Sequence, residues 1–221
     1  MSSADFFVIF ATLFTAAAFL ISWLVSRRVP YPRRHAAARR SAAAGIARSY
    51  KLALAPWARL ESRSHLPEEL ANRFYARSFL SIHFHLGVFT AAILLLFSPV
   101  LSEIPNQLSP FLGALLLFGL ICGIALLVRR MSNRNQRCIS IPDDYLAIIL
   151  VNLLVLAAIA FVFDPQAKGV FQIIGGVVLV YAPFGKIKHM LFTLTSLRYL
   201  GSHFGRRGVR PRPGECGEAE R

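Results

Sequence analysis

Three histidines lie within or directly after apolar stretches, where ionisable side chains are uncommon. His83 and His85 lie within the run SFLSIHFHLGVFTAAILLLFSPV, and His189 follows the apolar run that begins at Gly169. Ionisable groups inside a membrane are costly, and they usually pair with a partner or mark a functional site. Because a neutral imidazole can ligate haem iron, these histidines are candidate axial ligands of a buried haem.

The elements that would position these histidines are apolar helices. Apolar residues make up 55% of the 221-residue chain and charged residues only 16%, below the roughly 25% of ordinary soluble domains. A helix needs about 20 residues to cross the hydrocarbon core. Lipid offers no hydrogen-bond partners, so the backbone polar groups must bond to one another within the helix. We therefore expect an all-α integral membrane bundle of five helices. The five expected spans are residues 6–25, 78–100, 110–128, 145–163 and 169–189, with the last helix continuing to about Tyr199.

The net charge of +14 is distributed as in a membrane protein and does not predict nucleic-acid binding. Segment 27–77 contains twelve Arg or Lys residues against three glutamates, whereas the loop around Glu103 contains no Arg or Lys. Basic and neutral loops alternate, so the positive-inside rule predicts an outside N-terminus and a cytoplasmic C-terminus. The expected location is the inner (cytoplasmic) membrane, crossed several times and in contact with lipid.

The chain is expected to form one membrane domain with a tail. Residues 1–205 would be the five-span domain, with a basic cytoplasmic loop at 26–77 that lies on the lipid surface or docks a soluble partner. Residues 206–221 are rich in Gly, Pro and charge, which predicts a disordered tail. The three cysteines form no CxxC or CxxCH pair, so any redox group would be held non-covalently.

The expected topology tests whether two histidines can face one haem. His85 lies roughly 12 Å above Arg77 at ~1.5 Å per residue, and His189 ends a span that returns to the same side. Both histidines would therefore lie at similar depth in the cytoplasmic half. His83 is the alternative to His85 as the ligand. The two histidines are two positions apart, so at ~100° per residue they point to nearly opposite faces of the helix. Gly87 could let a flat macrocycle approach the helix, but it does not decide between them.

The motifs around these histidines resemble a known family. FHLG at residues 84–87 and PFGKIKHM at 183–190 resemble the cytochrome b (gamma) subunit of respiratory nitrate reductases. They are also similar to the membrane subunits associated with dissimilatory sulfite reductase, heterodisulfide reductase-like complexes and adenylylsulfate reductase. The resemblance covers the five-span layout and is sharpest in spans two and five. It implies that His85, rather than His83, pairs with His189 to ligate a haem on the cytoplasmic side.

A second haem of the nitrate reductase type has no ligands in this chain. In that type its ligands lie ten residues after the first histidine in span two and eighteen residues before the last one in span five. These positions are Leu95 and Phe171 here, and neither side chain can ligate iron. The resemblance therefore implies a single haem b, and it gives no support for the outer quinol site of that family.

The function that the resemblance implies is electron transfer between the quinone pool and cytoplasmic iron–sulfur or flavoprotein oxidoreductase subunits. The sequence contains no nucleotide loop, metal-cluster motif or catalytic triad pattern, so substrate chemistry would belong to those partners. Lys186 and Lys188 flank the His189 segment and are candidate partners of the haem propionates, although snorkelling to lipid headgroups explains them equally well. The alternative is a haem-free membrane anchor that recruits a soluble redox complex through its basic cytoplasmic surface.

Overall fold

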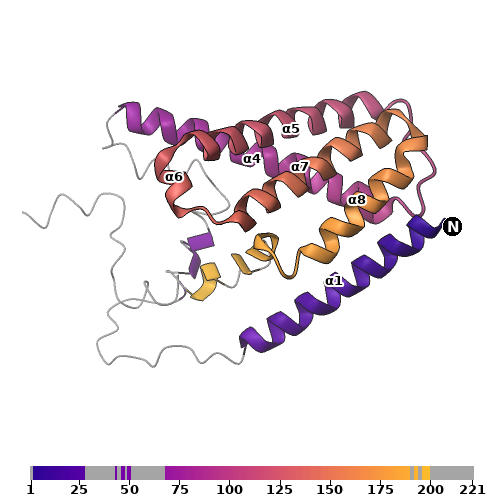
Figure 1. Cartoon of the computed structure of the whole chain (residues 1–221), viewed down its shortest axis with the longest axis horizontal. Coiled ribbons are helices and arrows are strands. Elements are labelled where there is room, and N and C mark those ends of the chain that lie inside the picture. The colour runs from indigo at the N-terminus through magenta and orange to yellow at the C-terminus, as the bar shows by residue number, and fades with distance from the viewer. Residues whose placement is uncertain are drawn as a thin grey trace, which may run out of the picture. The chain divides into compact units, whose positions relative to one another are not determined.

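The computed structural model describes residues 2–27, 43, 46, 47, 49, 50, 68–189, 192, 193 and 196–199, and these residues form helices and no strand. Four of the described helices are long and apolar enough to cross a membrane, which supports an all-helical membrane protein. They are α1 (Ser3–Arg27), α4 (Glu68–Phe97), α5 (Ser109–Ser132) and α7 (Pro142–Phe163), as Figure 1 shows.

Shorter elements connect and follow these four helices. They are α6 (Arg134–Ile139), the 3-10 turn η1 (Pro165–Ala167), helix α8 (Lys168–Tyr181) and the 3-10 turn η2 (Lys186–Lys188). The chain divides into two compact units, of which the first consists of Met1–Ile21 and Tyr75–Lys188. The second consists of Ser22–Phe74 and His189–Arg221. All contacts between helices given below lie within the first unit.

The predicted fifth span is wrong in its length. Helix α8 has 14 residues and ends at Tyr181, so it is about 21 Å long at 1.5 Å per residue. The cause is Pro183, which has no N–H to donate to the carbonyl of Leu179 four residues earlier. That carbonyl accepts instead from the backbone N–H of Ala182 (3.2 Å) and from the hydroxyl of Thr15 in α1 (2.6 Å). The chain then turns and forms η2, and no continuous helix reaches Tyr199.

Helix α4 differs from the predicted second span at its beginning. It starts at Glu68, ten residues before the apolar run, so the end of the predicted 26–77 loop is helical. Most of that loop and the whole predicted tail at 206–221 lie outside the described residues.

Local sequence explains how α7 begins. Pro142 occupies the first turn, where its missing N–H costs nothing. The carboxylate of Asp144 reaches back and accepts a hydrogen bond from the N–H of Ile141 (Oδ2–N 3.0 Å). This bond caps the start of the helix, and it places a buried carboxylate at this end of α7.

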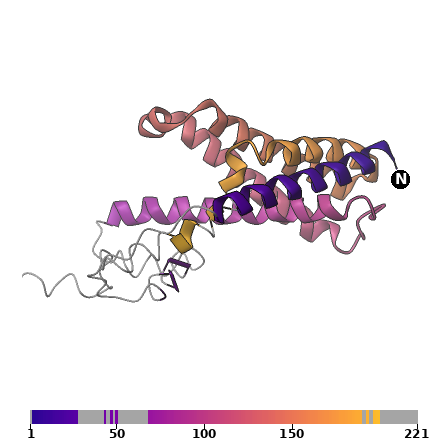
Figure 2. The same cartoon turned by 90° about the horizontal axis from the view of Figure 1, so that it is seen from below.

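Successive helices of the first unit pack antiparallel. Gly87 of α4 lies against Gly119 of α5, and the ring of Phe163 at the end of α7 covers Gly113 near the start of α5. The rings of Phe161 in α7 and Phe171 in α8 stack with their centroids 5.4 Å apart. Helix α1 runs alongside α8, as Figure 2 also shows. The ring of Phe7 in α1 packs on Gly176 of α8.

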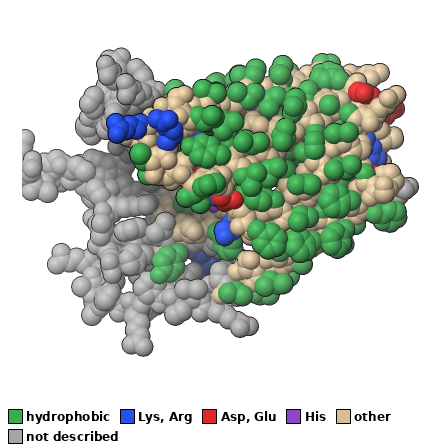
Figure 3. Space-filling view, viewed as in Figure 1, with side chains coloured by type: hydrophobic (Ala, Val, Ile, Leu, Met, Phe, Trp, Pro, Cys, Tyr) green, Lys and Arg blue, Asp and Glu red, His purple; other side chains and the backbone are tan. Residues whose placement is uncertain are grey.

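The core of the first unit is mostly apolar. One large cluster of buried residues draws on α1, α4, α5, α7 and α8, and a smaller one consists of Phe84, Cys122 and Val151. Figure 3 shows apolar side chains across one face of the helices, with acidic and basic side chains nearer the helix ends. An apolar outer face is what a lipid-facing bundle requires, because lipid tails leave polar side chains unsatisfied.

Candidate functional site

His85 projects from the outward face of α4. Its side chain is exposed, and the ring lies beside Phe84 and Phe89, with centroids 5.7 Å and 6.4 Å away. The Nδ1 atom lies 2.6 Å from the backbone carbonyl of Ser81, one helical turn earlier. This bond holds the imidazole in one orientation relative to the helix.

His83 makes the same kind of bond on a different face of α4. Its Nδ1 atom lies 2.8 Å from the carbonyl of Phe79. The ring is partly buried and contacts the rings of Phe79 and Phe118, with centroids 4.1 Å and 5.0 Å away. Phe118 belongs to α5, so His83 faces the α4–α5 contact.

The hydrogen bonds of both histidines determine which ring nitrogen can act as a ligand. A carbonyl oxygen only accepts hydrogen bonds, so Nδ1 of each ring must carry the proton. In the neutral imidazole the lone pair is then on Nε2. Metal-ligating histidines usually have this arrangement, with the other ring nitrogen donating to a carbonyl or carboxylate. Both rings therefore have the tautomer that an axial haem ligand needs.

Gly87 does not offer an opening for a flat macrocycle. It is buried, and a Cβ built on it would lie 2.9 Å from the Cα of Gly119 in α5. The two glycines let the backbones of α4 and α5 meet directly, as small residues do in membrane helix pairs. Because His83 lies one turn before Gly87 on this same face, the neighbouring helix occupies the space that a cofactor would need there. His85 lies on a different face of α4, where its ring lies beside Phe84 and Phe89 of the same helix.

Lys186 and Lys188 differ in their surroundings. The Nζ atom of Lys186 lies 2.8 Å from Oδ1 of Asp144, and Arg130 contacts the same oxygen at 3.1 Å. Lys186 is therefore an ion-pair partner of a buried carboxylate at the start of α7. The side chain of Lys188 is exposed. Their predicted role as propionate partners stays a prediction for both.

The segment before His189 is packed onto the helices of the first unit. Ile187 of η2 is partly buried and packs against both hydrophobic clusters, including the one that contains Phe84, the neighbour of His85. His189 itself is exposed and is the first residue of the second segment of the second compact unit, and its carbonyl accepts a hydrogen bond from Thr193. The pairing of His85 with His189 stays a prediction.

Hydrophobic packing occupies the two positions at which the nitrate reductase type holds its second haem. Leu95 is 1% exposed and Phe171 is completely buried. Leu95 packs onto Gly175, where a Cβ would come within 2.3 Å of its side chain, and Phe171 stacks on Phe161. These two side chains fill the core between α4, α7 and α8.

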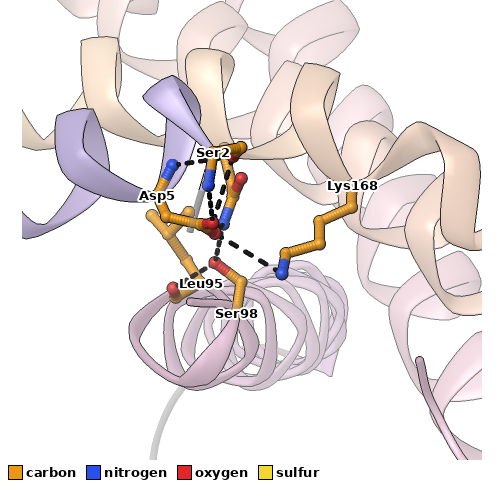
Figure 4. Close-up of polar contacts among 6 residues, drawn as sticks. Ser2, Asp5, Leu95, Ser98 and Lys168 are labelled. Carbon is orange, nitrogen blue, oxygen red and sulfur yellow. Dashed lines mark hydrogen bonds and ion pairs between the residues drawn. The ribbon is translucent and has the colours of Figure 1, made fainter. Parts of the chain in front are cut away.

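A buried polar cluster near the other end of the helices was not predicted from the sequence. Asp5 of α1 is 4% exposed, and its carboxylate accepts from Gln172 Nε2 (2.7 Å) and the backbone N–H of Ser2 (2.6 Å). Lys168 Nζ lies 3.4 Å from the same carboxylate, and Ser98, the residue after the end of α4, accepts from Gln172 (3.1 Å) (Figure 4). The cluster ties α1, α4 and α8 together. The signal that could have found it is an acid in the first turn of a span, which is rarely left unpaired in a membrane.

The comparisons with known proteins add no assignment. No family model, curated protein or solved structure matches this chain. The resemblance in the two histidine motifs therefore stays a prediction. Among the described residues, no group of three or more His, Cys, Asp or Glu side chains could hold a metal ion. A haem site with two histidines needs no such group.

Proposed function

We propose that the chain is a membrane cytochrome b subunit that passes electrons between the quinone pool and a cytoplasmic oxidoreductase. One b-type haem would be held by His85 and His189, in a protein with its N-terminus outside and C-terminus in the cytoplasm. The observation that supports this most directly is the bond from His85 to Ser81, which leaves the Nε2 lone pair on the outward face of α4. A haem with two histidine ligands supplies one-electron transfer without an open position for oxygen chemistry.

Each residue has a distinct part in this proposal. His85 presents Nε2 for ligation, and its bond to Ser81 limits rotation of the ring. Ile187 packs the segment that leads to His189 against the cluster containing Phe84. Lys188 offers an exposed cation beside that segment, where a propionate would need a charge partner.

The decisive experiment compares His85→Ala with His83→Ala. Each variant loses an imidazole that bonds to the carbonyl four residues earlier, so the two changes are closely matched in α4. We expect the wild-type protein, purified from cells with adequate haem supply, to show a b-type reduced-minus-oxidised spectrum with about one haem per chain. His85→Ala should lose that signal because an axial ligand is gone, whereas His83→Ala should keep it.

Other outcomes would contradict specific parts of the proposal. Loss of haem in His83→Ala alone would assign the ligand to His83. Two haems per chain would contradict the single-haem assignment based on Leu95 and Phe171. A wild-type protein without haem would favour the haem-free anchor, which should lose function when the basic segment between α1 and α4 is altered.

A further inference from the structure

The buried carboxylate of Asp144 joins three separate parts of the first unit. It caps the start of α7 through Ile141, and it binds Arg130 at the end of α5 and Lys186 in η2. The Asp144 side chain is 7% exposed, against 34% for Arg130 and 49% for Lys186. A buried carboxylate that loses its cation partners pays a large desolvation cost, so the pairing strongly favours this arrangement.

The segment that Asp144 holds has little helical support of its own. Helix α8 has ended at Tyr181, and the four residues before Lys186 form turns around Pro183. Ile187 packs η2 against the hydrophobic clusters, and Lys186 binds Asp144. The apolar contact is not directional, whereas the ion pair fixes one atom of η2 relative to α7.

We infer that Asp144 is a positioning residue that acts through Lys186 to fix η2, and with it the backbone that leads directly into His189. This inference rests on the proposed function, because His189 is the haem ligand in that proposal. It also assigns Lys186 to Asp144, which leaves Lys188 as the cation of the pair that can meet a propionate. Arg130 belongs to α5 and binds the same carboxylate from that helix.

The test uses the full-length protein in detergent and two readouts. The first is the rate of tryptic cleavage after Lys188, followed by mass spectrometry, which reports local opening of η2 whether or not haem is bound. The second is the highest g value in the electron paramagnetic resonance spectrum of the oxidised protein, which reports the geometry of the axial ligands. Thermal unfolding of each variant checks that the fold is retained.

We expect Asp144→Asn and Lys186→Gln to raise the cleavage rate after Lys188, by roughly tenfold, since opening no longer breaks a charged pair. Both should also shift the g value. Lys186→Arg keeps a cation and should restore wild-type behaviour. Arg130→Gln removes the other cation of Asp144, and Asp164→Asn changes an exposed acid at the far end of α7. Neither should shift either readout.

The two readouts separate failure of this inference from failure of the proposed function. Unchanged cleavage and an unchanged g value in Lys186→Gln, whose side chain is half-exposed and tolerant of change, would overturn the inference while the haem remained. An equal effect of Arg130→Gln would also overturn it, since the role would then be general stability of the charged cluster. A wild-type protein without haem would overturn the proposed function, and the cleavage rates would still decide whether Asp144 holds η2.

Discussion

At the scale of single residues, the clearest energetic test is Asp5. Its buried carboxylate accepts hydrogen bonds from Gln172 and Ser2 and pairs with Lys168. Asp5→Asn keeps the shape but removes the charge, so Lys168 loses its ionic partner. We expect a loss of about 1–3 kcal/mol in the free energy of unfolding, measured by denaturant titration in micelles. Asp164→Asn is the control and should change it by less than about 0.5 kcal/mol. Equal effects of the two would show that the polar cluster contributes no stability.

The residues of the candidate site were predictable from the sequence to different degrees. His83 and His85 stand out because imidazoles are rare in apolar runs, but their orientation depends on which face of α4 meets α5. That face is set by the contact of Gly87 with Gly119, which no pattern in α4 alone specifies. The pairing of Asp144 with Lys186 joins residues 42 positions apart, so the local sequence around either residue could not predict it.

At the scale of elements, the contact between α4 and α5 determines which histidine faces outward. A Cβ on Gly119 would lie 2.8 Å from the Cα of Gly87, and backbone atoms cannot move aside. We expect Gly119→Ala to force the helices apart and to lower the free energy of unfolding by about 1–3 kcal/mol. Gly169→Ala is the matched control, because nothing lies within 4 Å of its Cβ and alanine favours a helix. Thermal unfolding in detergent measures both. A Gly119→Ala protein as stable as Gly169→Ala would contradict the close approach.

The elements themselves were largely predictable, because an apolar run of about 20 residues has few other ways to satisfy its backbone in lipid. The ends of α5 and α7 fall within a few residues of the expected spans. The fifth span failed because hydropathy counts side chains and does not register where Pro183 interrupts the backbone bonds. The carbonyl of Leu179 found its partner in Thr15, which lies in another helix, so the sequence around Pro183 could not predict it.

At the scale of the whole molecule, the proposed orientation places the two ends of α7 on opposite sides of the membrane. This helix has 22 residues, enough for about 33 Å, and the hydrocarbon core is about 30 Å thick. Cys138 is exposed just before α7, and Gln166 is exposed just after it. The arginines on the Cys138 side predict that this end is cytoplasmic.

A membrane-impermeant thiol reagent applied to intact cells tests this orientation. In a Cys216→Ser background, we expect Gln166→Cys to be labelled from outside and Cys138 to be labelled only after the membrane is permeabilised. Cys122 serves as an internal control, because it is buried between helices and should stay unlabelled in the folded protein. The reverse pattern would invert the orientation and place the candidate haem ligands toward the outside. Labelling of Cys138 and position 166 from the same side would contradict a membrane-spanning α7, since its two ends must then share one compartment.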